Sequence, residues 1–212
     1  MRLLASLTLL VIASATQAQM PSTDPVPKGV YSLDKAHASL TFRVSHLGFS
    51  TWTARFTRYD AKLSFDPAQP TASSVEVTID PRSISADNVP EDFLETLATD
   101  DKWLDADQHP DMTFVSKRVE VAGDTLLVRG DLTVRGVTRP LVLLARYNGG
   151  YASHPYEPQA RIGFSAQGSF KRSDFGLEYG LPAPGTTFGV GDEVQVILEA
   201  EFSGPPPRTA QR

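Results

Sequence analysis

The chain of 212 residues contains no cysteine, so it has neither a disulfide framework nor a thiol that could serve as a nucleophile or accept a lipid anchor. It also lacks an excess of positive charge. Its 20 basic and 25 acidic residues give a net charge of −5, which argues against nucleic acid as a partner. After the N-terminus, no segment approaches the roughly twenty apolar residues of a transmembrane helix. Stability must therefore come from a buried core.

The N-terminus has the features of an export signal. Arg2 supplies the positive start, residues 3–13 form an apolar stretch, and residues 16–18 form a cleavage site of the small-residue kind. We therefore predict a cleaved signal peptide over residues 1–18, a flexible leader over 19–30, one folded domain over 31–203 and a flexible tail over 204–212. This arrangement predicts a periplasmic protein that is secreted and soluble.

Apolar and polar residues alternate through most of the chain, as in Leu40, Phe42 and Val44, which are separated by Thr41 and Arg43. A period of two is typical of β-strands with one buried face. The pattern predicts strands over residues 31–33, 38–46, 55–65, 74–80, 112–119, 125–135, 139–147, 159–171 and 193–203. Their short connections favour an all-β, antiparallel barrel of about eight strands.

One segment, residues 90–104, has helical spacing instead. Helical spacing relates its apolar residues Phe93, Leu94, Leu97 and Leu104, which lie three, four or seven positions apart, and Asn88 is a candidate cap. It is the one helix that the sequence predicts.

Motifs for catalysis or metal binding are missing. The four histidines, His37, His46, His109 and His154, stand at no spacing typical of metal ligands. The sequence contains no Gly-x-Ser-x-Gly elbow and no strand-to-helix phosphate loop. His46 ends the apolar row that begins at Leu40, so two interpretations stay open: a polar contact at a cavity mouth, or an exposed histidine at a strand end.

The barrel interior is either packed solid or open to a guest. Many of the eleven phenylalanines fall on the inferred inner face, where they fill a core or line a cavity. Ala61, Gly130, Ala166 and Gly168 are small at positions where bulk would fill the interior. We therefore predict a cavity.

Several short motifs, in this order and spacing, resemble the YceI-like family over about residues 31–203. They are Asp34-x-x-His37, residues 40–48, residues 65–67, residues 75–80 with Ser83-Ile84, His109-Pro110-x-x-Thr113-Phe114, residues 130–140, and Arg172-x-Asp174-Phe175-Gly176-Leu177. The resemblance implies a lipocalin-like barrel, usually periplasmic, that holds a polyisoprenoid such as a quinone tail and acts by binding rather than catalysis. Trp103 departs from the family, which often has a histidine in this segment.

From the alternation and the resemblance we predict a carrier of a long-chain isoprenoid lipid, a polyprenol or a quinone tail, with no catalytic residue, no metal and no other cofactor. The predicted ligand contacts are Phe42, Val44, His46, Phe65, Val77, Trp103, Phe114, Phe164 and Phe170. A membrane protein is the expected donor or acceptor of the lipid, and a homodimer is left open.

Two alternatives remain. In the first, the barrel is solid and its loops, residues 149–158 and 177–191, dock on another envelope protein. In the second, the protein is an enzyme of isoprenoid or quinone metabolism, in which His46 acts with Asp34 or Asp174.

Overall fold

The computed structural model describes residues 26–154 and 157–205. The predicted signal peptide, residues 19–25 of the predicted leader and residues 206–212 of the predicted tail lie outside these described residues. Within them the strands are β1 (Gly29–His46), β2 (Ser50–Phe56), β3 (Tyr59–Phe65), β4 (Ser74–Ile79), β5 (Ile84–Ser85), β6 (Met112–Ala122), β7 (Thr125–Val134), β8 (Val137–Tyr151), β9 (Arg161–Lys171) and β10 (Val190–Ser203). The helices are η1 (Pro70–Ala72), η2 (Pro81–Ser83), α1 (Phe93–Thr99) and η3 (Arg172–Phe175).

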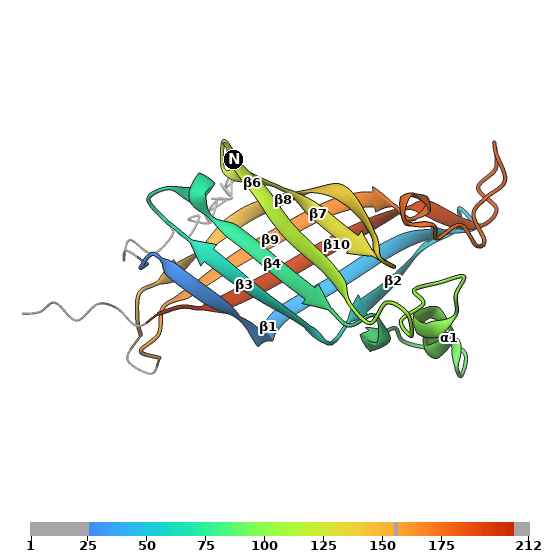
Figure 1. Ribbon diagram of the computed structural model, residues 1–212, viewed down its shortest axis with the longest axis horizontal. Helices are drawn as coiled ribbons and strands as arrows, with labels where there is room; N and C mark the ends of the chain where they lie inside the picture. Colours follow the sequence, from blue (N-terminus) through green and yellow to red (C-terminus); the bar gives the residue numbers. More distant parts are fainter. Residues whose placement is uncertain (1–25, 155–156, 206–212) are drawn as a thin grey trace, which may run out of the picture.

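Eight strands form a closed antiparallel barrel (Figure 1). The order around it is β10-β9-β8-β7-β6-β4-β3-β1, and β1 pairs again with β10 to close the ring. Closure removes the unpaired edges that an open sheet would expose. The predicted antiparallel barrel of about eight strands is confirmed.

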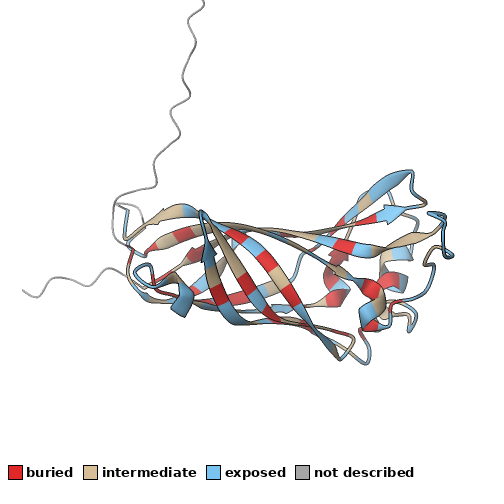
Figure 2. Cartoon of the chain, turned by 90° about the horizontal axis from the view of Figure 1, so that it is seen from above, coloured by how far each residue is buried: buried red, intermediate tan, exposed pale blue. Residues whose placement is uncertain are grey.

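The alternation of the sequence becomes an inner and an outer face. Along β3, Ala61, Leu63 and Phe65 are buried, and the residues between them are exposed. Figure 2 shows buried residues interspersed with partly buried and exposed ones along the other barrel strands. β7 and β8 form a hairpin, in which Arg135 and Gly136 both adopt positive φ, at 50° and 70°, as a two-residue turn of type I′ requires.

Several predicted strand boundaries differ from the structure, and two of the differences change the strand assignment. Residues 34–37, left out of the predicted strands, form a bulge inside the single strand β1, where the Asp34 side chain accepts a hydrogen bond from the Ala36 amide. The expected strand over residues 55–65 is instead two strands, β2 and β3. They separate at Thr57 and Arg58, whose backbone groups bond to Ser83 and Asp80 rather than to β1.

The helix is present but shorter than its predicted range of 90–104. Asp92 has a left-handed conformation with φ of 59°, so the helix starts only at Phe93. Asp100 is extended and ends it, while its amide bonds to the Thr96 carbonyl. The predicted cap Asn88 is not the N-cap residue, which is Asp92. Leu104 lies in the following turn and bonds back to Leu97.

The two ends of the barrel differ. At one end, hereafter the α1 end, lie α1, the β1–β2 turn and the loop before β10; the N-terminal part of β1 and the C-terminal part of β10 lie at the other (Figure 1). A large apolar cluster lines the barrel toward the α1 end and a smaller one lies at the opposite end. Among the residues that the structure describes, no helix has the length and apolar character needed to cross a membrane.

Candidate functional site

A cavity of about 510 Å³ occupies the barrel interior at the α1 end. Its wall is formed by the inward residues of β1, β2, β6, β7, β9 and β10, and α1 with its preceding loop covers one side. The lining residues are Leu40, Phe42, Val44, His46, Ser50, Trp52, Phe56, Ile79, Ile84, Asn88, Val89, Pro90, Phe93, Leu97, Trp103, Leu104, Met112, Leu132, Val134, Phe170, Arg172, Leu177, Val190, Val194 and Val196.

A second cavity of about 130 Å³ lies deeper in the barrel. Leu40 lines both cavities, so they meet near this side chain. Apolar residues from β3, β4, β6, β8, β9 and β10 dominate its wall, among them Ala61, Leu63, Val75, Leu143 and Ala166. The interior is therefore open in two regions that both adjoin Leu40, instead of being filled from end to end.

All nine predicted contact residues lie on these walls. Phe42, Val44, His46, Trp103 and Phe170 line the larger cavity. The smaller cavity is lined by Phe65, Val77, Phe114 and Phe164. Their position is thus inside the barrel, while their contact with a ligand stays a prediction.

Two of the four small residues do not make room in the way the sequence suggested. At Gly130, an added Cβ would lie 2.6 Å from the Phe114 ring, and at Gly168 it would lie 2.9 Å from Leu143 Cδ2. These glycines give space to neighbouring side chains of the protein. Ala61 and Ala166 do border the smaller cavity, as expected.

An aromatic cluster lies inside the barrel at the end opposite α1. Phe65 stacks on Tyr147 with ring centres 5.7 Å apart and meets Phe164 edge-on at 5.7 Å. Tyr31 is fully buried against Phe65, and Phe202 packs on Phe164. Burial raises the pKa of Tyr31 to about 12, with Tyr147 adding to the shift. We call these five residues the aromatic plug.

The other end is open to solvent. His46, Ser50, Asn88, Pro90 and Phe93 line the larger cavity and are themselves exposed, so they mark its mouth. The larger cavity therefore opens to solvent at the α1 end.

Arg172 is the charged residue on the wall of the larger cavity, and it is 4% exposed. Its guanidinium donates to the carbonyls of Gly191, Leu177, Tyr179 and Val190 at 2.6–3.0 Å. Burial lowers the pKa of Arg172 from its usual range and the Asp192 carboxylate opposes that shift, but a guanidinium remains charged at neutral pH.

Arg172 lies on the cavity wall beside other polar residues. Val190, whose carbonyl accepts from Arg172, pairs with His46 across the β1–β10 ladder, and His46 pairs with Ser50 across the β1–β2 ladder. These contacts place Arg172, His46 and Ser50 at one side of the cavity near its mouth. We call them the polar pole. Toward Leu40 the wall is apolar, so the cavity is amphipathic along its length.

The arrangement does not assemble the catalytic pair that the sequence left open. Asp34 and His46 are both on β1, twelve residues apart, or about 40 Å along a strand that rises about 3.3 Å per residue. Asp174 is exposed in η3, and within the described ranges no hydrogen bond or ion pair joins it to the His46 ring. His46 therefore has no carboxylate to orient it as a general base.

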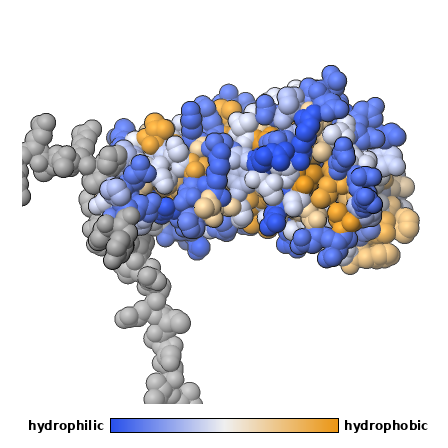
Figure 3. Space-filling view, turned by 90° about the horizontal axis from the view of Figure 1, so that it is seen from below, coloured by the Kyte–Doolittle hydropathy of each residue, from blue (hydrophilic) through white to orange (hydrophobic). Residues whose placement is uncertain are grey.

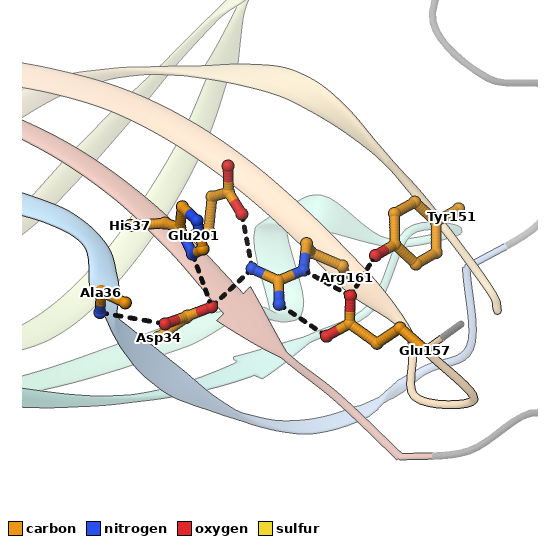
Figure 4. Close-up of polar contacts among 7 residues, drawn as sticks. All are labelled: Asp34, Ala36, His37, Tyr151, Glu157, Arg161 and Glu201. Atoms are coloured by element: carbon orange, nitrogen blue, oxygen red, sulfur yellow. Dashed lines mark hydrogen bonds and ion pairs between the residues drawn. The ribbon is translucent and has the colours of Figure 1, made fainter. Parts of the chain in front are cut away.

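A second polar cluster lies at the end opposite α1, around Arg161 (Figure 4). Arg161 Nη1 lies 2.6 Å from both Asp34 Oδ2 and Glu201 Oε2, and its other nitrogens contact Glu157. Hydrogen bonds from His37 and Arg161 lower the pKa of Asp34 to about 2. The oxygen and nitrogen atoms of Asp34, His37 and Glu201 are close enough to ligate a metal, but the Arg161 cation already holds both carboxylates. This cluster is an ion-pair network, not a metal centre.

Some lining residues were missed from the sequence. Val194 and Val196 belong to the alternating row of β10 and could have been chosen by the same rule as Phe42. Trp52 and Phe56 lie on β2, which was not recognised as a separate strand. Arg172 belongs to a motif of the family resemblance, but periodicity gave no sign of its place on the wall, which depends on the fold of the loop that it bonds.

Known proteins share this sequence and fold. The YceI-like domain model matches residues 31–202. A UPF0312 protein of Vibrio cholerae is 34% identical over 172 residues, 81% of this chain and 88% of that protein. A crystal structure of a Campylobacter jejuni YceI protein has a TM-score of 0.61 and 30% identity, covering 82% of this chain and 96% of that chain. A polyisoprenoid binding domain from Saccharophagus degradans, implicated in plant cell wall breakdown, has a TM-score of 0.60 and 19% identity, covering 82% and 98%.

Proposed function

The chain belongs to the YceI-like domain family, and from this membership and its apolar interior we propose that it binds and carries a long-chain isoprenoid lipid, a polyprenol or a quinone with an isoprenoid tail. The polyisoprenoid binding domain of Saccharophagus degradans, which shares the fold, supports this choice of ligand class. The signal predicted over residues 1–18 supports the periplasm as its location.

The observation that carries the proposal is the pair of cavities that meet at Leu40. The larger, at about 510 Å³, lies in the range of small-molecule sites, about 300–1,000 Å³. Burying about 300 Å² of apolar tail contributes roughly 7 kcal/mol before the cost of ordering the ligand. Hydrophobic burial is thus sufficient for binding without any catalytic group.

The amphipathic wall orients the ligand. An apolar tail fits toward Leu40 and the smaller cavity, where the wall is aliphatic and aromatic. A head group that accepts hydrogen bonds fits at the polar pole, beside the charged Arg172. Head groups with carbonyl or phosphate oxygens should therefore bind more tightly than a bare hydrocarbon of equal length.

The alternatives have less support. The interaction module with a solid core conflicts with the open interior, and the enzyme conflicts with the separation of His46 from Asp34. Binding without catalysis is accordingly our proposal.

The test is lipid analysis of the purified protein combined with ligand uptake. We expect organic extracts to contain an isoprenoid lipid and the emptied protein to take up an offered polyprenol or quinone. Val196→Trp fills the larger cavity and should reduce uptake, whereas Gln195→Trp, on the outer face one residue away, should not. An empty extract together with no uptake would overturn the proposal.

A further inference from the structure

Exposed aromatic side chains gather at the mouth of the larger cavity. Phe49 is 81% exposed, Phe188 71%, Tyr179 55% and Phe93 36%. Across the described part of the chain, the other large hydrophobic residues with such exposure are aliphatic: Val30, Val115, Val121 and Leu144. Isolated exposed aliphatic residues are normal on a protein surface, but a group of exposed aromatic rings around one opening is not.

Each of these aromatic residues adjoins the cavity wall. Phe49 precedes the lining residue Ser50, and Phe188 is two residues before the lining residue Val190. Phe93 itself lines the cavity. The Tyr179 ring packs edge-on against that of Trp103, another wall residue, with centres 5.3 Å apart. The exposed rings therefore lie close to the opening.

The two loops that bear Phe49 and Phe188 lie against each other. The Leu47 amide donates to the Gly189 carbonyl at 2.8 Å, and the Val190 amide donates to the Gly180 carbonyl at 2.7 Å. Contact is so close at Gly48 that an added Cβ would lie 2.6 Å from Thr187 Oγ1. We call residues 47–49 and 179–189 together the aromatic tip. Figure 3 shows hydrophobic residues at this end of the molecule.

The tip carries no formal charge. Residues 47–54 and 179–191 contain no Asp, Glu, Lys or Arg, although these residues make up 21% of the chain. The neighbouring Lys102 ammonium lies 5.5 Å from the Tyr179 ring centre, but within the tip itself a partner recognised through salt bridges would find no charged group. The tip suits a neutral surface that accepts aromatic rings, and the interfacial region of a lipid bilayer has this chemistry.

We propose that the aromatic tip inserts into the surface of a lipid bilayer and holds the cavity mouth against it. The class of cargo rests on the proposed function: an isoprenoid lipid resides in membranes, and a mouth docked there lets its tail enter the barrel without crossing water. The opposite end carries the charged Arg161 network in place of an uncharged aromatic surface, so it lacks the chemistry of the tip. Docking thus has one orientation.

The experiment measures association with phosphatidylcholine vesicles by flotation. Wild-type protein should float with the vesicles, and Phe49→Ser with Phe188→Ser should weaken the association by about tenfold or more. Val121→Ser with Leu144→Ser removes two exposed apolar residues of the barrel wall and is the matched control, which should bind like wild type. Thermal unfolding of both double variants checks that they fold. Added salt should leave the association unchanged, because no charge is involved.

Several results would overturn the inference: wild-type protein that does not float, equal loss in the control, or association that needs anionic lipid and disappears with salt. The tip could instead hold two copies of the chain together. In that case wild-type protein would be a dimer that does not bind vesicles, and the tip variant would be a monomer. Uptake of an isoprenoid from detergent solution is measured separately on the same proteins. If the tip variant still takes up the isoprenoid, the proposed function stands whether or not the protein binds vesicles. If wild-type protein takes up none, the proposed function is contradicted, independently of the flotation result.

Discussion

Arg161 on β9 lies 2.6 Å from the Oδ2 atom of Asp34 on β1, a contact between residues 127 positions apart in the chain. Between them lies β10, whose Glu201 also contacts Arg161 at 2.6 Å. The first and last strands of the barrel pair with each other at this seam. One arginine therefore links three neighbouring strands where the barrel closes, next to the aromatic plug.

The Asp34–Arg161 contact predicts acid sensitivity. The pKa of Asp34 is lowered from 3.8 to about 2 in the folded protein, so its contribution is fully present above about pH 3.8 and is lost as the pH falls toward 2. Asp34→Asn should reduce the free energy of unfolding at neutral pH by about 1–2 kcal/mol and flatten its decline in that acid range. Urea unfolding at a series of pH values measures this. Asp124→Asn, exposed in the β6–β7 turn, is the control, and an equal effect there would contradict the prediction.

Gly130 should resist enlargement. A Cβ at this position would lie 2.5 Å from the Val115 carbonyl oxygen and 2.6 Å from the Phe114 ring, so the β6–β7 backbone would have to move. Gly130→Ala should destabilise the protein by about 1–3 kcal/mol, measured by thermal or urea unfolding. Gly163→Ala meets only Asn148 Cβ at 3.8 Å and should have little effect. An equal loss of stability in the two variants would contradict the prediction, because it would show that the Phe114 ring does not need the space at Gly130.

The fold was predictable because its main signal is local. Alternation along β3, β7 and β10 follows directly from one buried and one exposed face, and Arg135-Gly136 supplies the turn that joins β7 to β8. The break between β2 and β3 was not predictable. It depends on Ser83 and Asp80, more than twenty residues away, which bond the backbone of Thr57 and Arg58.

The site was predictable only for its apolar part. Phe42 and Phe170 lie on the wall because alternation places them on the inner face, and any closed barrel would bring them together. Arg172 depends on a loop that turns its carbonyls toward the guanidinium, an arrangement with no periodic signal. The aromatic tip was missed for the same reason, since the Leu47–Gly189 bond that joins its loops connects distant segments.

Arg172 should be essential for the order of the loop that precedes β10. It donates to four backbone carbonyls, and its loss would leave several of them without a partner in a buried setting. Arg172→Met should lower the free energy of unfolding by about 2–4 kcal/mol and increase hydrogen exchange over residues 177–191. Arg172→Lys should recover only part of this, because an ammonium cannot reproduce the planar fork.

The neighbouring exposed residue provides the control for Arg172. Lys171→Met removes a charge one position away, on an exposed side chain, and should leave both stability and exchange unchanged. Normal exchange over residues 177–191 in Arg172→Met would show that the loop is held by other contacts.

Tryptophan fluorescence should report ligand entry, because both tryptophans of the chain, Trp52 and Trp103, line the larger cavity. A quinone with an isoprenoid tail should quench their emission in a saturable manner. Trp103 lies beside the polar pole, with the Arg172 guanidinium 5.9 Å from its ring centre, so a quinone head placed there should quench Trp103 more than Trp52. Trp103→Phe should therefore lose more of the quenching than Trp52→Phe. A quinone without a tail, titrated in parallel, measures collisional quenching. The proposed orientation of the ligand would be contradicted if this compound alone quenched in a saturable manner, or if both variants lost the same share of the quenching.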